Sequence, residues 1–141
     1  MDTVKPTYKV ESDAEAAFQF LNGFFLVSRT NDQKGIVLRK NDEVIAAVLY
    51  VQYSGPNIFM HVAGKPGRKW ITKDLLYWTF HYPFSQMGCS RVSGWVEADN
   101  KDAIRFNEHL GFKREATLQG AGRGGVDVYI YRMFKEECRY G

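Results

Sequence analysis

The chain has 141 residues, of which 45% are hydrophobic and 25% charged, and these proportions are typical of one globular domain, here residues 1–141. Its 19 basic and 16 acidic side chains leave a net charge of +3, which is too balanced for the basic stripe of a nucleic-acid-binding protein. No apolar run approaches the roughly 18 residues that a membrane-spanning helix requires. The two cysteines match no metal-ligand spacing, so we expect reduced thiols, with a disulfide as the alternative. A cytoplasmic protein is expected, without a metal ion and without membrane or nucleic-acid partners.

The first part of the sequence predicts a strand followed by a helix. We expect a short strand at residues 5–10. Ser12 is suited to cap the helix, because Glu15 lies three residues later and completes a capping box. Residues 24–27 fit either the end of this helix or a further strand. Apolar residues follow the cap at helical spacing and Gly23 is suited to end the helix, the apolar positions being Ala14, Ala17, Phe18 and Leu21.

Three strands are expected next, joined by tight turns. The segments are rich in β-branched and aromatic side chains. Asn41-Asp42 favours a two-residue hairpin, because both residue types tolerate positive φ. The resulting antiparallel meander comprises strands at 36–40, 43–53 and 58–63, with a second turn at 54–57.

The second half of the sequence alternates helices and strands. A helix is expected at 68–82 and should end at Pro83, because the residue before a proline disfavours helical geometry. Its buried face is expected to carry Ile71, Leu75, Trp78 and Tyr82.

A second helix in this half should be capped by Asp99 or Asn100 and end at Gly111. Its expected apolar face is Ala103, Phe106 and Leu110. Strands are expected at 91–97, 112–118 and 126–133, with a glycine-rich loop at 120–125. This mixed order of elements indicates an α+β fold of the α/β sandwich type.

The stretch Val96–Phe112, VEADNKDAIRFNEHLGF, carries the most specific pattern. It resembles the helix near the C-terminus of the GNAT superfamily of acyl-CoA N-acyltransferases, and the order of elements from Thr7 to Phe134 is similar to that fold. The resemblance implies a mixed, mostly antiparallel sheet flanked by helices. It also implies acetyl-CoA as acyl donor and an amine of a small molecule or protein as acceptor. The combination of GRKW at Gly67–Trp70 with this helix looks most like the small stand-alone branch found in bacteriophages and prophages, whose members work in the host cytoplasm.

Acyl-donor binding is expected in two places. The N-terminus of a helix binds phosphate readily, and a turn opens a predicted helix where basic residues gather. The resemblance implies that this loop binds the pyrophosphate, whereas an ordinary solvated surface is the alternative. The loop residues concerned are Gly67, Arg68, Lys69, Trp70 and Thr72, and Trp70 and Thr72 stand where the family usually has small residues. By the same resemblance, the strands at 59–63 and 91–96 splay and bind the pantetheine arm. There Val62 or its neighbour faces the thioester oxygen, and Asn100 and Phe106 contact the cofactor; for Asn100 a capping role is the alternative.

Acyl transfer to an amine needs a base and is helped by an acid. Glu97, at the end of a predicted strand, is the first candidate base and His61 the second; a solvated carboxylate and a packed histidine are the alternatives. Asn107 stands where the family often has an acidic tyrosine, so it can only donate an amide hydrogen bond to the departing thiolate.

Three further hypotheses concern the function, the assembly and the glycine-rich loop. A GNAT-fold protein without catalysis, serving as a binding or virion-associated component, is the alternative function. A homodimer is a further prediction, formed by pairing of the aromatic strand at 126–134. The resemblance implies that the loop at 120–125 borders the acceptor pocket, and a plain hairpin loop is the alternative.

Overall fold

The computed structural model describes residues 7–24 and 28–140, and the ambiguous residues 25–27 lie outside this range. The chain forms two compact units. The first unit contains residues 7–51 (apart from 25–27), 61–79 and 140, and the second contains 52–60 and 80–139. That one domain spans the whole chain stays a prediction.

Four strands make the sheet of the first unit, in the order β1-β2-β3-β4. β1 pairs antiparallel with β2, and β2 with β3. The predicted hairpin between β2 and β3 is confirmed, because Asn41 and Asp42 both adopt positive φ (50° and 72°). The strands are β1 (Tyr8–Ser12), β2 (Lys34–Lys40), β3 (Glu43–Val51) and β4 (Phe59–Gly64), of which β4 starts in the second unit.

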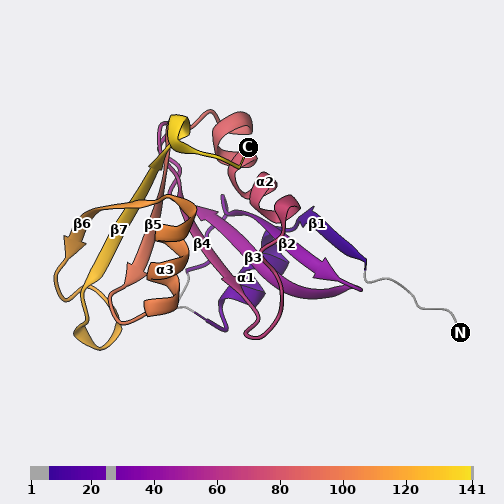
Figure 1. The fold of residues 1–141 in the computed structure, drawn as a ribbon, viewed down its shortest axis with the longest axis horizontal. Coiled ribbons are helices and arrows are strands. Elements are labelled where there is room, and N and C mark those ends of the chain that lie inside the picture. Colours follow the sequence, from indigo (N-terminus) through magenta and orange to yellow (C-terminus); the bar gives the residue numbers. More distant parts are fainter. Residues whose placement is uncertain (1–6, 25–27, 141) are drawn as a thin grey trace, which may run out of the picture. The chain divides into compact units, whose positions relative to one another are not determined.

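Helix α1 (Ala14–Leu21) packs against β2 and β3 (Figure 1). Ser12 is not its cap, because Ser12 pairs with Ile36 as the last residue of β1. Asp13 takes that role, and its Oδ1 accepts a hydrogen bond of 3.0 Å from the Ala16 N–H. Close packing depends on Gly35, because a Cβ there would lie 2.7 Å from the Cβ of Ala17.

Helix α2 (Lys73–His81) starts five residues later than predicted. Leu75 is buried as expected, but Ile71 lies before the helix and is exposed, as is Trp78. The predicted face is therefore wrong, and the buried positions of α2 are Leu75, Thr79 and Phe80.

Pro83 lies where the α-helical geometry of α2 gives way to a π-helical turn. The α-helical geometry stops at His81, but the chain continues as a π-helical turn, η1 (Tyr82–Gln86), rather than ending at the proline. Because a proline has no N–H, it cannot donate to the carbonyl four residues earlier, that of Thr79. The Tyr50 hydroxyl of β3 donates to this carbonyl instead, at 2.6 Å.

The second unit contains the strand order β4-β5-β7-β6, and α3 (Lys101–Leu110) lies along β5 (Figure 1). β4 is parallel to β5, whereas β5 with β7 and β7 with β6 are antiparallel. The strands are β5 (Arg91–Glu97), β6 (Lys113–Leu118) and β7 (Val128–Phe134), with short 3-10 turns η2 (Arg123–Gly125) and η3 (Lys135–Glu137). The predicted α+β class and element order are confirmed.

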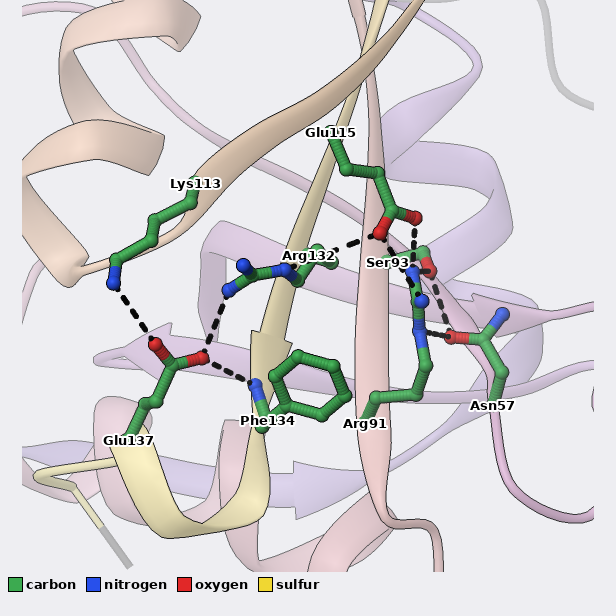
Figure 2. A network of polar contacts seen from close by, with 8 residues as sticks. All are labelled: Asn57, Arg91, Ser93, Lys113, Glu115, Arg132, Phe134 and Glu137. Atoms are coloured by element: carbon green, nitrogen blue, oxygen red, sulfur yellow. Dashed lines mark hydrogen bonds and ion pairs between the residues drawn. The ribbon is translucent and has the colours of Figure 1, made fainter.

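A network of polar contacts crosses the strands of the second unit (Figure 2). Arg91 donates from Nε to Asn57 Oδ1 (3.1 Å) and from Nη1 to Glu115 Oε1 (3.2 Å). Arg132 in turn lies 3.9 Å from Glu115 and donates to Glu137 Oε1 at 3.0 Å. The network thus joins the turn before β4 to η3. The paired side chains are 22–34% exposed, so water still screens the ion pairs and lowers what each contributes to stability.

No helix among the described residues is both long and apolar enough to cross a membrane.

Candidate functional site

The loop between β4 and α2 holds the predicted phosphate-binding residues of the first unit. Gly67 adopts φ +73°, and the Arg68 N–H donates to the Lys65 carbonyl at 3.2 Å, which closes a turn. α2 begins only after Thr72, whose Oγ1 accepts from the Leu75 N–H at 3.1 Å. Arg68 and Lys69 therefore lie in the loop and not in the first helical turn, which corrects the sequence prediction.

Trp70 is accommodated by a glycine at the end of β4. A Cβ built on Gly64 would fall far inside contact distance of three indole atoms of Trp70. The ring therefore lies directly against the Gly64 backbone, half-buried. This packing accommodates the volume of the Trp70 ring within the loop, because the ring lies back against β4.

Glu43, the first residue of β3, links the two basic side chains of this loop. Its Oε2 pairs with Lys65 Nζ, and its Oε1 accepts from Arg68 Nη2 at 3.1 Å. Hydrogen bonds from Lys65 and then Arg68 lower the pKa of the Glu43 carboxyl. Lys65 is further tied to β3 through its N–H, which donates to the Ile45 carbonyl at 2.8 Å.

His61 and Val62 lie in the part of β4 that belongs to the first unit, and both are half-buried. Burial lowers the pKa of His61, because the charged imidazolium loses hydration there. Burial therefore favours the neutral form of the imidazole.

Glu97, the first candidate base, is held by the glycine-rich loop of the second unit. Its Oε2 accepts from the backbone N–H of Arg123 at 2.6 Å, and its Oε1 accepts from Arg123 Nε and Nη2 at 3.0 and 2.8 Å. The side-chain hydrogen bonds of Arg123, followed by its backbone N–H, lower the pKa of Glu97. A carboxylate held in this way is a weak proton acceptor, because protonation would break the pair.

The residues of the predicted cofactor helix lie in α3. Asn100 is its N-cap, and its Oδ1 accepts from the Ala103 N–H at 3.1 Å, so the choice between Asp99 and Asn100 falls on Asn100. Phe106 is half-buried. Asn107 donates one amide hydrogen to the Ala103 carbonyl at 2.8 Å, so one of its two amide hydrogens is engaged within the helix.

The predicted site residues therefore fall into two groups. The first group lies in the first unit. His61 and Val62 are on β4, and the loop that follows β4 carries Gly67, Arg68, Lys69, Trp70 and Thr72. Glu97, Asn100, Phe106 and Asn107 belong to the second unit. Three contributors were not predicted: Glu43, Gly64 and Arg123.

The pairing of β4 with β5 is short. It joins Phe59 to Ser93 and Met60 to Gly94, and the register between the described parts of these strands contains no other pair. Within the described ranges 7–24 and 28–140, no three His, Cys, Asp or Glu side chains are grouped so as to hold a metal ion.

Known proteins resemble this chain in sequence and in fold. No family model matches it. It is 23% identical to a curated protein of Bacillus licheniformis, "Uncharacterized N-acetyltransferase p20", over 89% of this chain and 74% of that one.

Among solved structures, a mutant of the spermidine N-acetyltransferase SpeG from Vibrio cholerae superposes with a TM-score of 0.75 at 15% identity, covering 92% of this chain and 94% of the other. A dodecameric form of the V. cholerae enzyme gives the same TM-score of 0.75, identity of 15% and coverage of 92% and 94%. Its complex with manganese ions gives 0.73 at 14% identity, over 90% and 92% of the two chains. These likenesses show that the chain has the fold of these acetyltransferases.

Proposed function

We propose that this chain is an N-acetyltransferase that transfers the acetyl group of acetyl-CoA to an amine of a small molecule or protein. The observation that supports this most is the acetyltransferase fold, which extends over 92% of the chain. In the reaction the amine nitrogen attacks the thioester carbonyl, the C–N bond forms as the C–S bond breaks, and one proton leaves the amine. Coenzyme A departs as the thiol.

The loop at 65–72 is proposed to bind the pyrophosphate of acetyl-CoA. Lys65, Arg68 and Lys69 supply positive charge there, and the α2 N-terminus after Thr72 supplies the positive end of a helix dipole. The backbone of Val62 and its neighbours is proposed to face the thioester. The sequence resemblance supports this, because Val62 lies on β4, the strand that the resemblance assigns to the pantetheine arm. The roles predicted for Asn100, Phe106 and Asn107 stay predictions.

Removing two loop cations tests the phosphate assignment. Arg68→Ala with Lys69→Ala should weaken acetyl-CoA binding at least several-fold, because charge-assisted contacts to phosphate are lost. Isothermal titration measures the affinity. The control Lys113→Ala with Lys135→Ala removes the same charge from the second unit, outside α3, and should leave the affinity unchanged. Equal affinity of the loop variant and the wild type would remove these cations from the site.

We propose His61, rather than Glu97, as the base. A base must be deprotonated to act, and the lowered pKa of His61 keeps it so at pH 7. Glu97 is also deprotonated, but Arg123 holds both of its oxygens. Glu97 is then the anchor of the glycine-rich loop.

The pH dependence of turnover distinguishes these two candidates. With an accepted amine, from a panel that includes spermidine, kcat/KM should rise with pH through a pKa below 6.5, as His61 loses its proton. His61→Gln should abolish this acid limb and lower kcat, whereas Glu97→Gln should retain the limb. A limb that survives in His61→Gln and disappears in Glu97→Gln would return the role to Glu97.

The finer assignments are also proposals. The GRKW resemblance at Gly67–Trp70 supports a place in the phage and prophage branch, with action in the host cytoplasm. The V. cholerae enzyme, which has the same fold, forms a dodecamer, and this supports self-association of the present chain. The predicted homodimer is the simplest form of self-association.

A second candidate function is a GNAT-fold binding protein without catalysis. The observation that favours it is Asn107, which cannot protonate the thiolate and already donates to the Ala103 carbonyl. Specific acetyl-CoA binding without turnover of any amine would support this alternative.

A further inference from the structure

Glu43 is the feature of the first unit that the proposed function does not use. It lies at the start of β3, directly after the Asn41-Asp42 turn, and no local sequence pattern connects it with the loop at 65–72. Yet its carboxylate forms ion pairs with both Lys65 and Arg68. The closest contact of Lys65 is to Oε2, and that of Arg68 is to Oε1. Glu43, Lys65 and Arg68 are called the loop triad below.

In the loop triad one carboxylate lies between two cations, an arrangement that also suits a phosphate group. Lys65 is fixed by its backbone bond to Ile45, and Arg68 is fixed to Lys65 by the turn at Gly67. Both cationic heads converge on one anion with two oxygens. A phosphate group offers the same cations more oxygens and more charge, and arginine binds carboxylate and phosphate with the same donor fork.

We infer that Glu43 is an internal competitor of the acyl donor's pyrophosphate: its carboxylate holds Lys65 and Arg68 together before binding and must release them as the donor binds. This inference rests on the proposed function, since it concerns the same loop. It makes Glu43 a residue that sets the affinity for acetyl-CoA without contacting the acetyl group. The exchange breaks two ion pairs and forms new ones, and no covalent bond changes.

The energy of this exchange is small enough to allow release. The three side chains are between one third and one half exposed, so water screens the pairs. Partly exposed pairs are broken at low cost, and the donor's larger charge compensates for them. Removal of the carboxylate should therefore favour donor binding, because the triad's charge rises from +1 to +2.

The test compares Glu43→Gln with the wild type by titration with coenzyme A. We expect about three- to tenfold tighter binding, the range that loss of one or two exposed ion pairs predicts. The gain should shrink as salt is raised from 0.1 M towards 1 M, where the screening length falls to about 3 Å. Affinity for pantetheine, which has no pyrophosphate, should not change.

Two further variants make the result specific. Asp42→Asn removes the same charge from the neighbouring residue, and asparagine also tolerates the positive φ of that position, so coenzyme A affinity should stay at the wild-type value. In a Lys65→Gln/Arg68→Gln background, Glu43→Gln should have no effect, because the two cations for which Glu43 and the pyrophosphate compete are gone. Thermal unfolding of each variant confirms that it is folded.

The other outcomes are distinct. If the wild type binds coenzyme A and Glu43→Gln binds it equally or more weakly, Glu43 is no competitor and the proposed function stands. If Asp42→Asn tightens binding as much, the effect is one of general charge and the inference is wrong. If no variant binds coenzyme A, the phosphate loop itself is wrong, and the inference fails with it.

Discussion

Leu110→Ala is expected to lower the free energy of unfolding by about 2–5 kcal/mol, the range for leucine truncation in a packed core. Leu110 is the last residue of α3, its side chain is 3% exposed, and it lies one residue before the Gly111 C-cap. Truncation leaves a cavity that the helix end cannot fill, since Gly111 holds the chain in left-handed geometry with φ +108°. Chemical denaturation monitored by circular dichroism measures the change.

Leu118→Ala is the matched control for this variant. It removes the same atoms from β6, where the side chain is 39% exposed, so a change within about 0.5 kcal/mol is expected. If Leu110→Ala and Leu118→Ala unfold at the same denaturant concentration, Leu110 is not part of the core.

Gly64→Ala is expected to dislodge Trp70 and with it the loop at 65–72. The added methyl group would occupy the space of the indole ring, and neither the β4 backbone nor the rigid ring can yield by that amount. Overpacking of this kind costs about 1–3 kcal/mol of stability. Acetyl-CoA binding should fall by more than in the loop double variant above, because every group on the loop is displaced. Calorimetry and tryptophan fluorescence report the two effects.

A rescue variant identifies the cause of that loss. Gly64→Ala with Trp70→Ala removes both the added methyl group and the ring it meets, so part of the stability and affinity should return. Gly23→Ala serves as the control, since a Cβ there meets only a carbonyl oxygen at an ordinary 3.5 Å. A double variant no better than Gly64→Ala would mean that the clash between the added methyl group and the ring is not what lowers stability and affinity.

Local signals predicted the elements that local contacts determine. α3 is an example: the Asn100 cap, the buried Leu110 and the αL glycine at Gly111 all lie within one segment and act over a few residues. The β2–β3 hairpin is another, because the two positive-φ residues of its turn can be identified from their side chains alone.

The errors arose where a distant residue decides the local structure. Ser12 and Asp13 are both good caps, and the strand pairing of Ser12 with Ile36 decides between them. The start of α2 was placed too early because Ile71 continues the helical spacing of Leu75 and Trp78, although Ile71 lies before the helix. The contact of Trp70 with Gly64 holds this segment as a loop instead.

The candidate site shows the same division. The sequence located the loop and the strands that carry the candidate residues. It could not predict that Glu43 binds Lys65 and Arg68, or that Arg123 binds Glu97, because each pair is brought together only by the folded sheet. These partners change the chemistry of the predicted residues, since they determine which carboxylates and cations are already engaged.

The carbonyl of Thr79 links two positions that are far apart in the sequence. Pro83 removes the backbone donor that would ordinarily bind this oxygen, and the Tyr50 hydroxyl supplies another at 2.6 Å. Tyr50→Phe would take this donor from the Thr79 carbonyl, and Pro83 has no N–H to replace it. We therefore expect the effects of substitutions at 50 and 83 on stability to be non-additive.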